Sequence, residues 1–82
     1  MVMPTVLRVK GYRFFFFSRD LSEPAHVHAA RSDDYAKFWL EPVGLARNCG
    51  FRSHELLEIR GLIEEHEALL QEKWNEHFRS QG

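Results

Sequence analysis

The sequence predicts an α+β domain with an antiparallel meander of about four short strands, a short helix and a long C-terminal helix packed on the sheet. Short apolar segments before residue 41 have the length and residue types of strands. Turn-forming residues separate these segments. From residue 53 onward, apolar positions recur at helical spacing. A chain of 82 residues has room for one domain, residues 1–82.

All strands are expected within residues 4–41, as two hairpins. The first hairpin joins residues 5–10, which alternate apolar and polar side chains, to residues 12–17, which include four consecutive phenylalanines. The second joins residues 25–31 to residues 35–40 across a turn of serine and aspartate residues. Because turn residues bound each apolar run, all four segments are predicted to be strands.

Two helices are expected in the C-terminal half. Pro42 suits the first turn of a helix and Gly50 suits the position after its end, so a short helix is predicted over residues 42–49. The long helix is predicted over residues 53–79, with room for a kink near His66. Its apolar stripe consists of Leu56, Ile59, Ile63, Leu70, Trp74 and Phe78.

Composition and charge narrow the class of protein. The single cysteine, Cys49, excludes an intramolecular disulfide and a zinc site built on several cysteines. No apolar run has the length of a signal peptide or a membrane span, so a cytoplasmic protein without a membrane partner is expected. Residues 1–52 hold eight Lys/Arg and five Asp/Glu, whereas residues 53–82 hold three and seven. The predicted sheet is therefore basic and the predicted long helix acidic.

The segment Glu23-Pro24-Ala25-His26-Val27-His28 offers the most chemistry. Residues i and i+2 of a strand share a face, so His26 and His28 should stand roughly 6–7 Å apart. Histidine titrates near neutral pH, so the pair could act as general acid and general base in a metal-independent ribonuclease. Arg31 or Lys37 would then steady the phosphate, which makes these four residues the candidate catalytic set.

Two other roles for the histidine pair remain open. The rings could cap loop carbonyls at the start of the strand, which is a structural role. They could instead bind a transition metal with Glu23, but the spacing fixes no third ligand, so no metal and no cofactor is predicted. Acid/base chemistry requires both imidazoles to face solvent in a concave site, whereas rings bonded to backbone inside the core would be structural.

Aromatic residues of the strands are the candidates for a partner surface: Phe15, Phe17 and Trp39. A small sheet under one long helix has a second face to cover, and exposed phenylalanine rings are costly. We therefore expect this face to lie against a second copy or a partner protein, unless residues 42–49 of the same chain close it. Interleaved aromatic and basic side chains also suit RNA, although an ordinary core with snorkelling cations has the same pattern.

Five segments follow the pattern of a known family. They are Met3–Arg8, Gly11–Phe16, Glu23–His28, Ala36–Leu40 and Trp74–Glu76. Together they resemble the small prokaryotic family called domain of unknown function 4160, which usually has a second proline where this chain has Ala25. Such genes resemble toxin–antitoxin components in size and often lie beside another small gene. The resemblance implies a small partner protein encoded nearby, and no particular reaction.

Three functions are compatible with these observations. The leading hypothesis is a small bacterial protein that acts through a protein partner, as a component of a toxin–antitoxin-like module does. The first alternative is a metal-independent ribonuclease that uses His26 and His28 as its acid/base pair. The second alternative is a stoichiometric inhibitor whose acidic C-terminal helix competes with nucleic acid for a basic groove.

Overall fold

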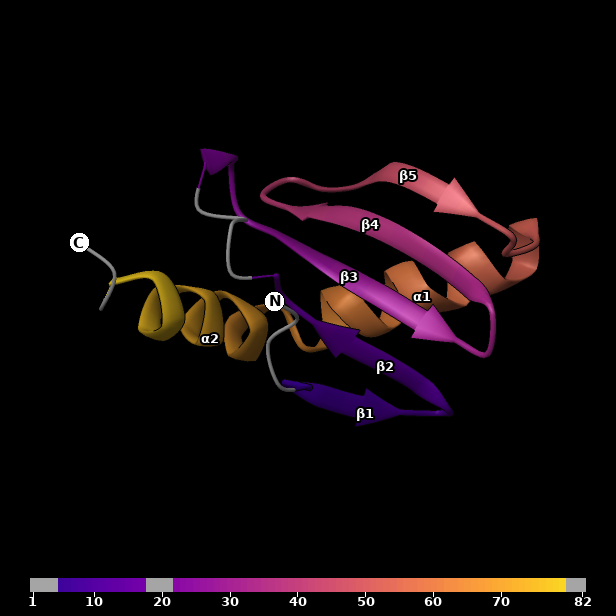
Figure 1. The fold of residues 1–82 in the computed structure, drawn as a ribbon, viewed down its shortest axis with the longest axis horizontal. Coiled ribbons are helices and arrows are strands. Elements are labelled where there is room, and N and C mark those ends of the chain that lie inside the picture. Colours follow the sequence, from indigo (N-terminus) through magenta and orange to yellow (C-terminus); the bar gives the residue numbers. More distant parts are fainter. Residues whose placement is uncertain (1–4, 18–21, 80–82) are drawn as a thin grey trace.

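The structure is a computed structural model that describes residues 5–17 and 22–79. Its elements are β1 (Leu7–Val9), β2 (Tyr12–Phe15), β3 (His26–Arg31), β4 (Asp34–Leu40), β5 (Val43–Cys49), α1 (Ser53–Glu65) and α2 (Glu67–Arg79). The strands pair antiparallel in the order β1-β2-β3-β4-β5 and form one meander (Figure 1). The predicted α+β class is confirmed. The first four strands are displaced by at most two residues at either end from the predicted segments.

One face of the sheet carries the core. Residues directly opposite on neighbouring strands point to the same face, and the register aligns Phe14, Ala29 and Ala36 across β2, β3 and β4. Figure 1 shows α1 behind this sheet and α2 continuing past the ends of the strands. The helices contribute Ile59, Leu62, Ile63, Leu70, Trp74 and Phe78 to the core, which includes most of the predicted apolar stripe.

The short helix predicted over residues 42–49 is wrong, because this segment is strand β5. Its residues pair with β4, for example Val43 with Leu40 and Cys49 with Tyr35. Pro42 lies in the turn between the two strands, where its peptide bond with Glu41 is cis. Pairing with β4 satisfies the backbone of this segment and overrides its weak local signals.

The predicted long helix is interrupted at His66, so residues 53–79 form two helices. The ring nitrogen Nδ1 of His66 lies 2.9 Å from the carbonyl oxygen of Leu62, and the backbone nitrogen lies 3.0 Å from the same oxygen. At the other end of α1, the backbone N–H of Arg52 donates to Oε1 of Glu55 at 2.8 Å. This bond satisfies one of the free donors at the start of the helix.

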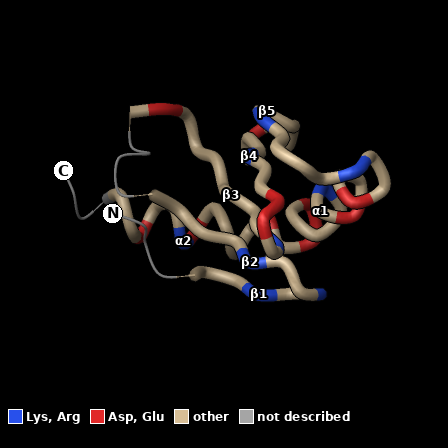
Figure 2. The backbone as a smooth tube through the Cα atoms, turned by 45° about the vertical axis from the view of Figure 1, so that its right-hand side comes forward, with Lys and Arg blue, Asp and Glu red and all other residues tan. Residues whose placement is uncertain are grey.

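Charge is distributed unevenly over the fold. Figure 2 shows lysine and arginine on β1, on β2 and in the turn between them, and residues 5–17 contain no aspartate or glutamate. The helices carry seven glutamates. Among the described residues, no helix is long and apolar enough to cross a membrane.

Candidate functional site

His26 and His28 lie on the face of β3 opposite the core. In the register His28 is opposite Lys37 and His26 is opposite Trp39, whereas the intervening Val27 belongs to the core. The ring of His28 packs among those of Phe15, Phe17 and Tyr35, at centroid distances of 5.5, 4.4 and 5.6 Å. Its Nδ1 lies 2.8 Å from the hydroxyl oxygen of Tyr35, and the residue is 3% exposed.

His26 is enclosed more completely than His28. It is 0% exposed, and its ring centroid lies 5.7 Å from that of Trp39 and 5.2 Å from that of Trp74 on α2. Its Nδ1 is 2.9 Å from the carbonyl oxygen of Pro24. Because a carbonyl oxygen can only accept, Nδ1 carries the hydrogen and donates it, which fixes the orientation of the ring.

The enclosure of the two rings supports the structural role among the three left open by the sequence. Acid/base catalysis needs each imidazole within hydrogen-bond distance of a reacting atom. His26 is held by a backbone carbonyl inside the fold, and His28 is surrounded by aromatic rings. Neither imidazole faces solvent, since His26 and His28 are both buried, so the ribonuclease alternative gains no support from the geometry.

The two candidate cations lie on opposite faces of the sheet. Lys37 forms an ion pair with Glu23, and its Nζ lies 4.9 Å from the ring centroid of Trp39. Arg31 instead forms an ion pair with Glu55 of α1, and its guanidinium lies 4.2 Å over the ring of Tyr12 in the core. The structure therefore brings Lys37, but not Arg31, beside the histidine pair.

The contact of Arg31 with α1 is part of a small polar cluster. The hydroxyl of Tyr12 donates to Oε1 of Glu58 at 2.7 Å. Burial raises the pKa of Tyr12 to about 12, and the hydrogen bond to Glu58 acts in the same direction. The pKa of Glu55 is lowered, first by the hydrogen bond from the Arg52 backbone and also by Arg31, against the effect of burial. These contacts hold α1 to β2 and β3.

The metal alternative involved Glu23, His26 and His28. Oε1 of Glu23 lies 3.8 Å from Nδ1 of His26, which already donates to a carbonyl. Within residues 5–17 and 22–79, no group of three or more His, Cys, Asp or Glu side chains could hold a metal ion. These three residues therefore do not form a coordination site.

The aromatic residues predicted to bind a partner are partly covered by their own chain. Phe15 is 4% exposed, and the guanidinium of Arg13 lies 4.8 Å from its ring centroid. Phe17 and Trp39 are half-buried. Phe15 thus requires no partner to remove it from water, and β5 extends the sheet at its edge instead of closing this face.

The open edge of the sheet is the feature that the sequence reasoning missed. Within residues 5–17 and 22–79, β5 pairs with β4 and with no other strand, and its last five residues are exposed. Leu45 on β5 is 47% exposed and Leu57 on α1 is 71% exposed. Both line a groove of about 320 Å³ whose wall is formed by Phe38, Leu45, Ser53, Leu56, Leu57 and Arg60. Because the sequence predicted a helix over residues 42–49, this strand edge was not expected.

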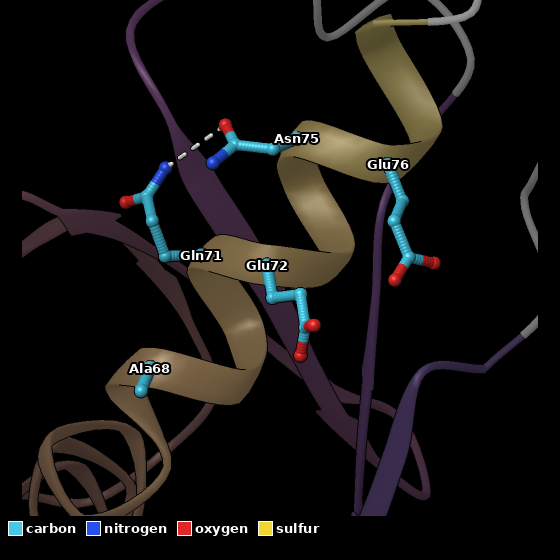
Figure 3. A pocket seen from close by; sticks show the side chains of 5 residues that line it. All are labelled: Ala68, Gln71, Glu72, Asn75 and Glu76. Carbon is cyan, nitrogen blue, oxygen red and sulfur yellow. Dashed lines mark hydrogen bonds between the residues drawn. The ribbon is translucent and has the colours of Figure 1, made fainter.

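A shallow hollow lies along the exposed side of α2 (Figure 3). It measures about 540 Å³ and is lined by Ala68, Gln71, Glu72, Asn75 and Glu76. The amide of Gln71 donates to Oδ1 of Asn75 at 3.5 Å, and both carboxylates are exposed. All five residues come from one helix, so the hollow is part of a solvated acidic helix face. The inhibitor hypothesis relies on an acidic helix face of this kind.

Comparison with known proteins identifies the family. The class defined by the fold is a small α+β domain with a five-stranded meander and two C-terminal helices. Residues 11–75 match the family described as Domain of unknown function (DUF4160), and this match spans more than half of the chain. The protein belongs to that family. Neither the curated proteins nor the solved structures contain a match.

Proposed function

We propose that this protein is a binding module that engages a small partner protein through the open edge of β5, in the manner of a toxin–antitoxin component. The observation that carries the proposal is the edge itself. Residues Leu45–Cys49 are exposed, and Leu45 and Leu57 form an apolar groove beside them. Among the described residues, no strand pairs with this edge.

Exposed sheet edges are templates for pairing, because they present unsatisfied backbone N–H and C=O groups. Proteins usually shorten such edges, cover them or protect them with charges and bulges. Here β5 is as long as β4 and carries one charged side chain, Arg47, although the register shifts between Lys37 and Phe38 opposite it. An added strand would satisfy the backbone, and a side-chain pocket would give specificity.

The charges around the edge favour an acidic partner segment. Arg47 lies on β5, Arg52 precedes α1, and Arg60 lines the groove while donating to the carbonyl oxygen of Val43. No carboxylate lines the groove or belongs to β5. We therefore specify the partner as an extended segment with an apolar residue for the groove and acidic residues beside it. A second copy of β5 would bring a further Arg47 to this basic edge and no carboxylate to pair with it.

The small size of the chain and the gene neighbourhood implied by its family make the product of the adjacent small gene the first partner to test. The two proteins are co-expressed and their affinity is measured by titration calorimetry. Hydrogen exchange of the β5 amides is followed with and without the partner. We expect association together with slower exchange across Val43–Cys49.

Substitutions in the groove separate this surface from the rest of the molecule. Leu45→Glu and Leu57→Glu should each weaken binding at least tenfold, because a buried unpaired carboxylate is costly. Ala68→Glu is the matched control, since it introduces the same charge at an exposed position on α2 and should leave binding unchanged. Absence of binding, or binding with unchanged affinity in both leucine variants, would contradict the proposal. So would a homodimer in sedimentation in which β5 is protected without the partner.

A further inference from the structure

Another pocket lies at the β1 edge of the sheet, where the β1–β2 and β3–β4 turns meet at one end. It measures about 270 Å³ and is lined by Arg8, Gly11, Arg13, Ala30, Arg31 and Ser32. Three of the six lining residues are arginines and none is acidic. Figure 2 shows this end of β1 and β2 as a basic part of the molecule.

The placement of Arg8 and Arg13 is unfavourable for the chain alone. The two residues are directly opposite each other on β1 and β2. Like charges at such positions repel, because their Cβ atoms are only about 5 Å apart. Within the described part of the chain, neither guanidinium has a carboxylate partner. An anion between them would remove the repulsion.

The guanidinium of Arg13 is already positioned by an aromatic ring, whereas that of Arg31 is turned to the core face of the sheet. Arg13 lies 4.8 Å over the ring of Phe15, and Arg31 lies 4.2 Å over that of Tyr12. Arg31 is also anchored by Glu55, which offsets its own charge. Groups held in this way lose less side-chain entropy when they bind a ligand. Guanidinium forks match the oxygens of a phosphate group, so phosphate is the anion that suits the pocket.

The surface beside the pocket indicates where such a phosphate would come from. Arg13 on β2 is directly opposite Ala30 on β3, which is directly opposite Tyr35 on β4. These three residues lie on the face opposite the core. Tyr35 therefore lies about 10 Å from Arg13, two strand spacings away. Farther along β4 on the same face, half-buried Trp39 follows Lys37. Half-exposed rings among cations are the usual platform for stacked bases.

We infer that Arg8 and Arg13 bind a backbone phosphate of single-stranded nucleic acid, whose bases lie over Tyr35 and Trp39. The interaction is binding without cleavage and is separate from the β5 edge. Most of its energy comes from phosphate contacts, so affinity falls as salt rises. Aromatic stacking makes it tolerant of sequence.

The test uses fluorescently labelled twelve-nucleotide RNA and DNA of one mixed sequence, with anisotropy measured at several salt concentrations. Arg8→Gln/Arg13→Gln should weaken binding about tenfold or more, because hydrogen bonds to charged groups are lost. The slope of log affinity against log salt should fall by roughly 0.7 for each phosphate contact removed. Arg31 is left unchanged because its ion pair with Glu55 supports the fold.

Arg52→Gln/Arg60→Gln is the matched control, since it removes the same charge from exposed residues near α1. It should change affinity and slope much less than the pocket variant. Tyr35→Leu should weaken oligonucleotide binding while leaving the salt slope unchanged. No binding of either oligonucleotide, or equal losses in the two double variants, would overturn the inference. So would arginine NMR shifts with inorganic phosphate but none with the oligonucleotides.

Discussion

At the scale of single residues, the ring of His26 is held by a hydrogen bond to the backbone and by its aromatic neighbours. The bond to the Pro24 carbonyl satisfies its donor, and the rings of Trp39 and Trp74 exclude water from it. A histidine in this setting contributes to packing much as a phenylalanine does. Its contribution should therefore appear in stability before it appears in any activity.

We predict that His26→Ala lowers the free energy of unfolding by about 2–4 kcal/mol, because it leaves a cavity among aromatic rings. Urea denaturation followed by circular dichroism measures the change. His54→Ala is the control, since this exposed histidine should alter stability by no more than about 0.5 kcal/mol. A fully stable His26→Ala protein would mean that the ring is not packed in solution and would revive its catalytic role.

Ionisation of Tyr12 should lower the stability of the fold at high pH. Its pKa in the folded chain is about 12, above the ordinary value of 10.0. Because the folded value is the higher one, the stabilisation is complete below pH 10 and is lost as the pH rises from 10 toward 12. Ultraviolet titration should show this late ionisation in the native chain and not in Tyr12→Phe. Glu58→Gln should lower the pKa of Tyr12, because the accepting carboxylate loses its charge. Identical high-pH titrations of the native chain and Tyr12→Phe would show that the hydrogen bond is absent.

At the scale of elements, local pattern and tertiary environment explain different parts of the structure. The four strands before residue 41 could be predicted, because alternation and turn residues are local signals. β5 could not be predicted. Apolar and polar residues alternate too weakly along residues 43–49 to outweigh Pro42 and Gly50, which look like the ends of a helix. The pairing of His26 and His28 on one face was also predictable. Their burial was not, because it depends on Trp74 and Phe15 arriving from other elements.

Alanine substitutions at two glycines test the backbone conformation before α1 and within it. Gly50, between β5 and α1, has φ +108°, and a Cβ there would lie 2.3 Å from Oδ1 of Asp34. Gly61 lies within α1, and a Cβ there would meet no atom within 4 Å. We predict that Gly50→Ala lowers the free energy of unfolding by more than about 1 kcal/mol. Gly61→Ala should raise it by about 0.5–1 kcal/mol through helix propensity. Thermal unfolding of the two variants measures both signs, and a stabilising Gly50→Ala would show that the turn differs in solution.

At the scale of the whole molecule, α2 makes the chain elongated, with principal extents of 37, 24 and 20 Å. It extends past the strand ends and is attached through Leu70 and two aromatic residues. Trp74 packs on Phe16 at a centroid distance of 5.4 Å, and Phe78 packs on the same ring at 6.1 Å. This small interface closes the core at the end of β2.

Removing the larger of these two rings should loosen the whole fold. We predict that Trp74→Ala lowers the free energy of unfolding by about 3–5 kcal/mol, a large share of what a small domain has. Hydrogen exchange should show α2 opening more readily than the strands, with the sheet following as stability falls. Lys73→Ala, on the same helix and partly exposed, is the control. Equal protection of α2 in the native and Trp74→Ala proteins would contradict this attachment.

The position of α2 at the end of the described chain also has a consequence for synthesis. Every strand pairs with its neighbour in sequence, so the meander can form hairpin by hairpin as the chain leaves the ribosome. Phe16, however, is covered by Trp74 and Phe78, which are translated much later. Until residues 67–79 emerge, a nascent strand rich in phenylalanine stays open to water and to other chains. Docking of α2 is therefore the step of synthesis that removes this phenylalanine-rich segment from water.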